Sequence, residues 1–181
     1  SLEEVVKKAE DLLKRVNDEL KKVSKKVRDD LRRVNEKLKT VVEDVLRKLE
    51  AVVDKIRKSG VDEERLRELK ELIERAKREL ERILEESEKT TRDVERESEE
   101  SLDRSRRTTE EAKRELDDVR RRGVDVKDVD KRIRDVVRRH EEVVETNARR
   151  VDEVVKRHDK LVKDLERRVE KVVRELEEKV R

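Results

Sequence analysis

The spacing of the apolar residues most constrains what this chain can fold into. From Leu2 to Ile56 the core-forming positions advance in 15 steps over 54 residues, a mean of 3.6 residues per step. That is the period of a straight α-helix, whereas a left-handed coiled coil would show 3.5. The same register returns every 18 residues, for example at Leu66, Leu84 and Leu102. The pattern therefore predicts long, nearly straight helices, each with one apolar face.

Two short Gly-Val-Asp segments interrupt this pattern. Gly60 and Gly123 are the only glycines of the chain, and each is followed two residues later by an aspartate. Glycine readily takes the left-handed conformation that ends a helix, and aspartate is a preferred N-cap of the next one. We therefore expect helices over about 2–58, 63–122 and 126–181, joined by loops at 60–62 and 123–125. Such tight loops make consecutive helices antiparallel neighbours, so the fold class is all-α: one up-down-up bundle of three helices in a single domain, 1–181.

The helix ends carry further local signals. Ser1 and Glu4 have the S-x-x-E spacing of a capping box. Val61 is placed to contact Ile56 behind it and Leu66 ahead of it. Val124 has the same relation to Val119 and Val129 in the second loop.

Composition excludes several classes of function. The chain is 58% charged with a net charge of only +3, and it lacks Cys, Phe, Trp, Tyr, Met, Pro and Gln. A disulfide framework, a cysteine zinc site and aromatic stacking on bases are therefore excluded. No apolar run has the length of a membrane span or of a signal peptide. We expect a soluble protein that binds neither a membrane nor a specific nucleic acid, and its cellular location stays open.

Polar residues occupy positions that the repeat assigns to the core. A buried polar group without a partner costs about 1–3 kcal/mol, so we expect these residues to meet one another. They form the candidate site, a buried polar network of Asn17, Ser24, Asn35, Ser87, Thr90, Thr91, Ser98, Ser101, Ser105, Thr108, Thr109, His140, Asn147 and His158.

Antiparallel geometry predicts which of them pair. In two antiparallel helices, residues at the same height have numbers with a constant sum. The facing ends 58 and 63 give a sum of about 121 for the first two helices, and the ends 122 and 126 give about 248 for the last two. The first rule pairs Asn35 with Ser87, Asn17 with Ser105, and Ser24 with Ser98. The second pairs His158 with Thr90, His140 with Thr108, and Asn147 with Ser101. The predicted layers are Asn35/Ser87/Thr90/Thr91/His158, its copy Asn17/Ser105/Thr108/Thr109/His140, and between them Asn147/Ser98/Ser101/Ser24.

The restricted alphabet, the duplicated loop, the 18-residue register and the isolated polar residues together resemble one class of protein. They are similar to de novo designed, parametrically generated helical bundles whose cores carry buried hydrogen-bond networks. The resemblance covers the whole chain and implies an engineered origin, but it supplies no active site.

The two histidines do not form a metal site by spacing. They are 18 residues apart, roughly 27 Å along a helix, and neither has a second His or Cys three or four residues away. Serine and threonine on a helix face usually bond back to the carbonyl four residues before them, so no activated nucleophile is indicated. We expect no metal, no cofactor and no enzymatic activity.

Two functional hypotheses remain. The first is a structural scaffold with no natural biochemical activity and no required partner, whose polar layers specify helix pairing. The alternative is a binding module of a designed assembly, in which helices 2–58 and 126–181 form a groove for a fourth helix or a second copy. Because protonation turns the one acceptor of a buried imidazole into a second donor, His140 and His158 also predict a loss of stability in mild acid.

Overall fold

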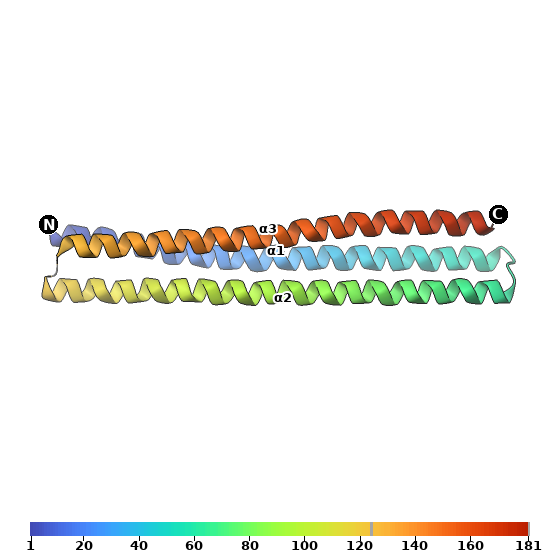
Figure 1. The fold of residues 1–181 in the computed structure, drawn as a ribbon, viewed down its shortest axis with the longest axis horizontal. Coiled ribbons are helices and arrows are strands. Elements are labelled where there is room, and N and C mark those ends of the chain that lie inside the picture. The colour runs from blue at the N-terminus through green and yellow to red at the C-terminus, as the bar shows by residue number, and fades with distance from the viewer. Residues whose placement is uncertain (124, 181) are drawn as a thin grey trace. The chain divides into compact units, whose positions relative to one another are not determined.

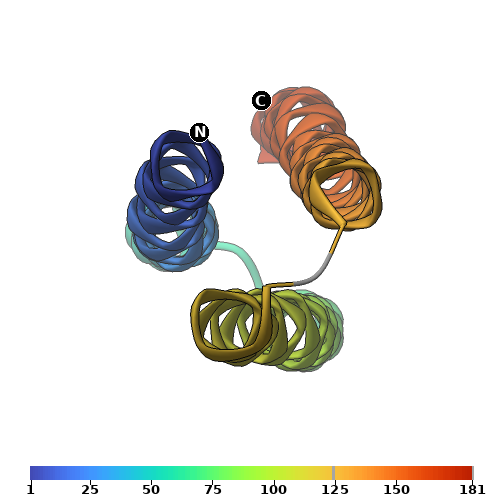
Figure 2. The ribbon, with the colours of Figure 1, turned by 90° about the vertical axis from the view of Figure 1, so that its left-hand side faces the viewer.

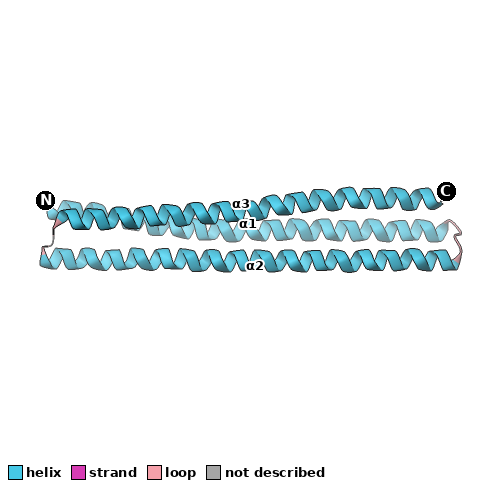
Figure 3. Ribbon diagram, in the orientation of Figure 1, coloured by secondary structure: helices cyan, strands magenta, loops and turns pink. Residues whose placement is uncertain are grey.

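The computed structural model describes residues 1–123 and 125–180, and it forms three long helices (Figures 1 and 3). These are α1 (Leu2–Lys58), α2 (Glu63–Arg122) and α3 (Val126–Val180). The chain is 96% helical, the described residues contain no strand, and each helix contacts the other two. The predicted all-α three-helix bundle is therefore confirmed. Its helix boundaries agree with the sequence prediction, except that Arg181 lies outside the described residues.

Both loops use the glycine and the aspartate as expected. Gly60 and Gly123 have φ of +78° and +68°, the left-handed region that glycine enters without steric cost. The Gly123 N–H donates to the carbonyl of Val119 at 2.9 Å, which closes the end of α2. At the start of α2, the Asp62 carboxylate accepts the Arg65 N–H at 2.8 Å, the geometry of an N-cap. The local sequence therefore determines where each helix ends.

The structure describes the contacts expected around the first loop but not those expected of Val124 in the second. Val61 and Leu66 pack against the apolar cluster that contains Ile56, as predicted. Val124 lies outside the described residues. At the N-terminus, the Glu4 carboxylate lies 3.8 Å from the Ser1 amino group, as the glutamate of a capping box would.

Contacts divide the chain into two compact units. Unit 1 comprises residues 1–30 and 93–152, and unit 2 comprises residues 31–92 and 153–181. Each unit contains one segment of every helix and one loop, with its α2 segment antiparallel to the other two (Figure 1). The near end of Figure 2 shows the three segments of unit 1 at the corners of a triangle. That both units belong to a single domain stays a prediction.

Each unit has its own apolar core. Unit 1 contains one cluster toward its loop and a second, smaller one around Val16, Leu20 and Leu102. Unit 2 contains one cluster next to its loop and a larger one around Leu38, Val42 and the apolar residues that face them. The candidate polar residues lie between or beside these clusters along the helices. Within the described part of the chain, no helix has a stretch apolar enough to cross a membrane.

Candidate functional site

Most of the candidate polar residues lie inside the bundle. Eight are buried, namely Ser87, Thr91, Ser98, Ser105, Thr109, His140, Asn147 and His158. Five are half-buried, namely Asn17, Ser24, Asn35, Ser101 and Thr108. Thr90 is exposed, and its hydroxyl donates to the Glu86 carbonyl of its own helix at 2.9 Å. The prediction that Thr90 belongs to a buried layer is therefore wrong.

The layer in unit 2 joins all three helices by side-chain hydrogen bonds. The Ser87 hydroxyl of α2 is bonded to Nε2 of His158 on α3. The other ring nitrogen of His158, Nδ1, lies 2.8 Å from the Val154 carbonyl. Because a carbonyl only accepts, Nδ1 carries the proton, and in the neutral ring Nε2 accepts the proton of Ser87.

On the other seam of this layer, the Asn35 amide of α1 reaches Thr91 of α2. Its Nδ2 donates to the Thr91 hydroxyl oxygen at 2.6 Å, and that hydroxyl donates to the Glu88 carbonyl at 2.9 Å. Thr91 is only 1% exposed and Asn35 is half-buried, so this bond lies at the edge of the core. The Asn35 carbonyl oxygen is buried and has no partner.

These bonds correct the predicted pairs Asn35 with Ser87 and His158 with Thr90. The height of a residue fixes its layer but not the helix that it faces. At 100° per residue, Thr91 lies about 40° from Ser87 around α2, toward α1. Thr90 lies about 60° from Ser87 in the opposite sense, at the solvent rim. Thr91 is therefore the partner for α1, and Ser87 is the partner for α3.

The copy of this layer in unit 1 is built differently. His140 is 2% exposed, and its Nε2 lies 3.2 Å from the carboxylate oxygen Oε2 of Glu19 on α1. Its Nδ1 is buried without a partner, and so is the carbonyl oxygen of Asn17. The hydroxyls of Thr108 and Thr109 each donate to a carbonyl of their own helix, both at 3.0 Å. The predicted pairs His140 with Thr108 and Asn17 with Ser105 do not form.

Glu19 is the site residue that the sequence reasoning missed. It contacts a buried histidine, yet its own side chain is 59% exposed. The 18-residue repeat places Lys37 at the equivalent position in unit 2, where it pairs with Asp159 of α3 at 3.1 Å. In these two pairs the α3 residue number exceeds the α1 number by 121 and 122. A constant-difference rule for parallel helices would have identified Glu19.

The third layer, also in unit 1, is the least connected. The Ser98 hydroxyl is buried without a partner, and the Asn147 amide donates to the Val143 carbonyl of its own helix at 2.9 Å. The predicted pairs Ser24 with Ser98 and Asn147 with Ser101 do not form. Asn147 turns back to the carbonyl four residues before it and does not reach across to Ser101 of α2.

A polar cleft lies between α1 and α2 beside these residues. It has a volume of about 350 Å³, and Asn17 and Ser24 are among its lining residues, together with Lys21, Arg28 and Arg106. A polar space of this size accommodates water molecules that can bridge separated side chains. Unit 1 therefore has polar layers that water can enter, whereas direct bonds join the helices in the layer of unit 2.

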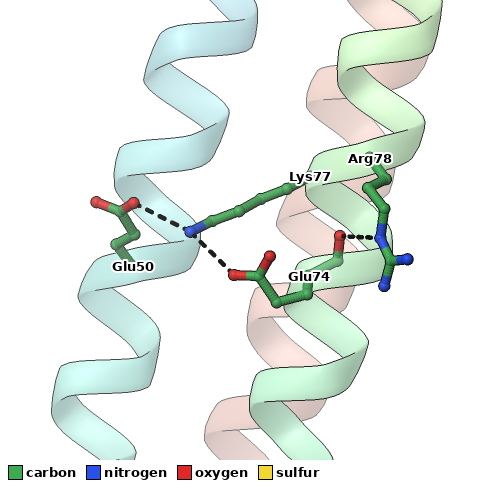
Figure 4. Close-up of polar contacts among 4 residues, drawn as sticks. All are labelled: Glu50, Glu74, Lys77 and Arg78. Atoms are coloured by element: carbon green, nitrogen blue, oxygen red, sulfur yellow. Dashed lines mark hydrogen bonds and ion pairs between the residues drawn. The ribbon is translucent and has the colours of Figure 1, made fainter.

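Charged residues along the seams form ion pairs between helices. In unit 2, Lys77 of α2 lies 3.2 Å from Glu50 of α1 and 3.5 Å from Glu74 of its own helix (Figure 4). The hydrogen bond with Glu50, assisted by the charge of Glu74, raises the pKa of Lys77 above its ordinary value of 10.5 against the opposing effect of partial burial. Beside this pair, the Arg78 side chain donates to the Glu74 backbone carbonyl at 3.4 Å. In unit 1, Arg120 pairs with Glu10 at 2.9 Å.

The chemistry open to these residues is limited by their burial. Ser87 and His158 have the hydroxyl–imidazole order of a nucleophile and its base, but each is only 7% exposed, so a substrate carbonyl has no approach to them. Within the described residues, no cluster of three or more His, Cys, Asp or Glu side chains could hold a metal ion.

The arrangement can hold helices in one register, because the bonds of unit 2 form at a single relative height. No protein-family model, no curated protein and no solved structure matches the chain.

Proposed function

We propose that this chain is an engineered structural scaffold in which buried polar residues specify the pairing and register of the helices. The observation that carries the proposal is the layer of unit 2, where Asn35 bonds to Thr91 and Ser87 to His158. A bundle held by apolar contacts alone tolerates sliding of one helix along another. A slid helix would break both bonds between helices, at about 1–3 kcal/mol for each buried group that is left without a partner, such as Nε2 of His158. Specification of pairing is the best-attested role of buried polar residues.

The test is to replace the layer of unit 2 with apolar residues in the variant Asn35→Leu, Ser87→Ala, Thr91→Val, His158→Leu. We expect equal or greater stability, because a paired polar group contributes little more than an apolar one of similar volume. We also expect several sets of backbone NMR signals, or association beyond the 21.8 kDa of one chain.

The matched control replaces the weakly connected layer of unit 1, by Asn17→Leu, Ser105→Ala, Thr109→Val, His140→Leu. This variant should keep one set of signals. A single set of signals and an unchanged mass in the unit 2 variant would show that the layer does not specify pairing.

A pH response is a second part of the proposal, and it depends on His158. Protonation would turn Nε2 into a donor, so the ring could no longer accept the Ser87 proton. His140 differs, because a protonated ring there would meet the carboxylate of Glu19. We therefore attribute the loss of stability expected in mild acid to His158 alone. The neighbouring Asp159 carboxylate pairs with Lys37 of α1 at 3.1 Å and not with the ring.

The alternative function is a binding module for a fourth helix or a second copy, and one observation favours it. In unit 1, the flank of α1 toward α3 keeps apolar side chains in contact with solvent. Val5 and Val23 are half-buried and Leu12 is 39% exposed, and Val144 of α3 is half-buried as well. Light scattering separates the two functions, since the scaffold has a mass of 21.8 kDa and a self-associating module has at least twice that.

A further inference from the structure

Unit 2 contains an apolar groove that the polar layers do not explain. It lies between α2 and α3, has a volume of about 180 Å³, and reaches down to Val45 and Leu49 of α1. Leu80 and Ile83 form its α2 wall, and Leu165 and Val169 form its α3 wall. At its open side Val172 is 43% exposed, so a molecule can enter from solvent.

The groove exists because one core position of α2 is small. Ala76 lines it and is half-buried, whereas the next copy of the 18-residue repeat has Val94 at the same position. The two missing methyl groups leave the α2–α3 seam unfilled at this height. Apolar surface that the bundle does not cover remains available to a ligand.

We propose that this groove binds a small, uncharged apolar molecule of about the size of toluene. An enclosed cavity of about 150 Å³ lined by Leu, Ile and Phe binds benzene, so a groove of about 180 Å³ that is open on one side has room for a ring of that size. The aliphatic lining side chains can neither donate nor accept a hydrogen bond. The two charged lining residues, Glu79 and Arg168, are exposed and opposite in sign, so their charges cancel at the rim.

Two other hollows suit such a ligand less well. The cleft between α1 and α2 in unit 1 is lined mainly by charged and polar residues, among them Lys21, Arg28 and Arg106. A second groove between α2 and α3, in unit 1, has about 150 Å³, but Arg132 and Glu115 form an ion pair at its rim at 3.1 Å. An apolar molecule therefore prefers the groove of unit 2.

The absence of Phe, Tyr and Trp makes the test direct. Toluene is titrated into the full chain with ¹³C-labelled Leu, Val and Ile methyl groups. Its ring protons are then the only aromatic protons besides those of the two histidines, so nuclear Overhauser contacts to methyl groups identify the site. We expect saturable shifts and contacts at Leu49, Leu80 and Leu165, with a dissociation constant on the order of 1 mM for so small a ligand.

Two variants and one control decide the assignment. Ala76→Leu fills the groove and should weaken binding at least about tenfold, and Ala76→Val, which copies the next repeat, should weaken it less. Ala51→Leu places the same side chain on the exposed face of α1 and should leave binding unchanged. Circular dichroism checks that each variant is folded. If Ala76→Leu does not fold, Ala76→Val alone tests the assignment. Unchanged binding in the folded Ala76 variants, or contacts at Val129 and Ile133 of the other groove instead, would overturn the proposal.

Discussion

Removing the hydroxyl of Ser87 tests whether the hydrogen bond to His158 stabilises the bundle. In Ser87→Ala the Nε2 atom of His158 keeps its buried position and loses its only donor. Leaving one buried acceptor unsatisfied costs about 1–3 kcal/mol. The substitution also raises helix propensity by about 0.5 kcal/mol, which partly offsets this cost.

Ser105→Ala is the matched control, because the 18-residue repeat places Ser105 at the same position in unit 1. Ser105 is buried like Ser87, but His140 is turned to Glu19 and not to Ser105. The control therefore has the same gain in helix propensity without the lost bond. The free energy of unfolding of the two variants should differ by about 1–3 kcal/mol, with Ser87→Ala the less stable.

Guanidinium denaturation followed by circular dichroism measures this difference, since the chain has no aromatic fluorophore. For a slope of about 4 kcal/mol per molar, the two midpoints should lie about 0.25–0.75 M apart. Equal midpoints for both variants, at equal slopes, would refute the claim that the Ser87–His158 bond contributes to stability.

Three further outcomes are expected. Glu19→Gln keeps an acceptor for His140 and removes only the negative charge, so the denaturation midpoint at neutral pH should be nearly unchanged. Lys77→Met should lower stability by no more than about 1 kcal/mol, since the two carboxylates that pair with Lys77 are 61% and 60% exposed. Because its pKa is raised, the contribution of Lys77 is fully present below pH 10.5 and is lost as the pH rises further, so the parent and Lys77→Met should converge in denaturation at high alkaline pH. Ala76→Leu should raise stability by about 0.5–2 kcal/mol by filling the groove, measured as a higher denaturation midpoint.

The helices and their ends could be predicted because the signals are local. A period of 3.6, one glycine per loop and an aspartate two residues later each act within a few residues of the chain. The conformations of Gly60 and Gly123 and the cap at Asp62 follow from these signals alone. In the first loop the tertiary contact agrees with these signals, since Val61 packs against the cluster that contains Ile56.

The pairing inside the layers could not be predicted from height alone. A sum of residue numbers gives the position along the axis, but each helix of a three-helix bundle faces two neighbours. A rotation of about 40° decides that Thr91, and not Ser87, meets Asn35. Thr90 is a second example. It lies at the predicted height, but it is exposed to solvent and not buried in the layer.

The difference between the two copied layers has its origin outside the layers themselves. An identical polar set, Asn, Ser, Thr, Thr and His, recurs after 18 residues, yet His158 turns to a serine and His140 to a carboxylate. At the rim of α1, Glu19 attracts the imidazole N–H of its unit. The equivalent Lys37 carries a positive charge with no acceptor, and it pairs with Asp159 instead. The imidazole of His158 therefore finds its partner in the core. This position at the rim of α1 is acidic in unit 1 and basic in unit 2. The charge at that one position thus decides whether the buried histidine bonds to the internal network or to the rim.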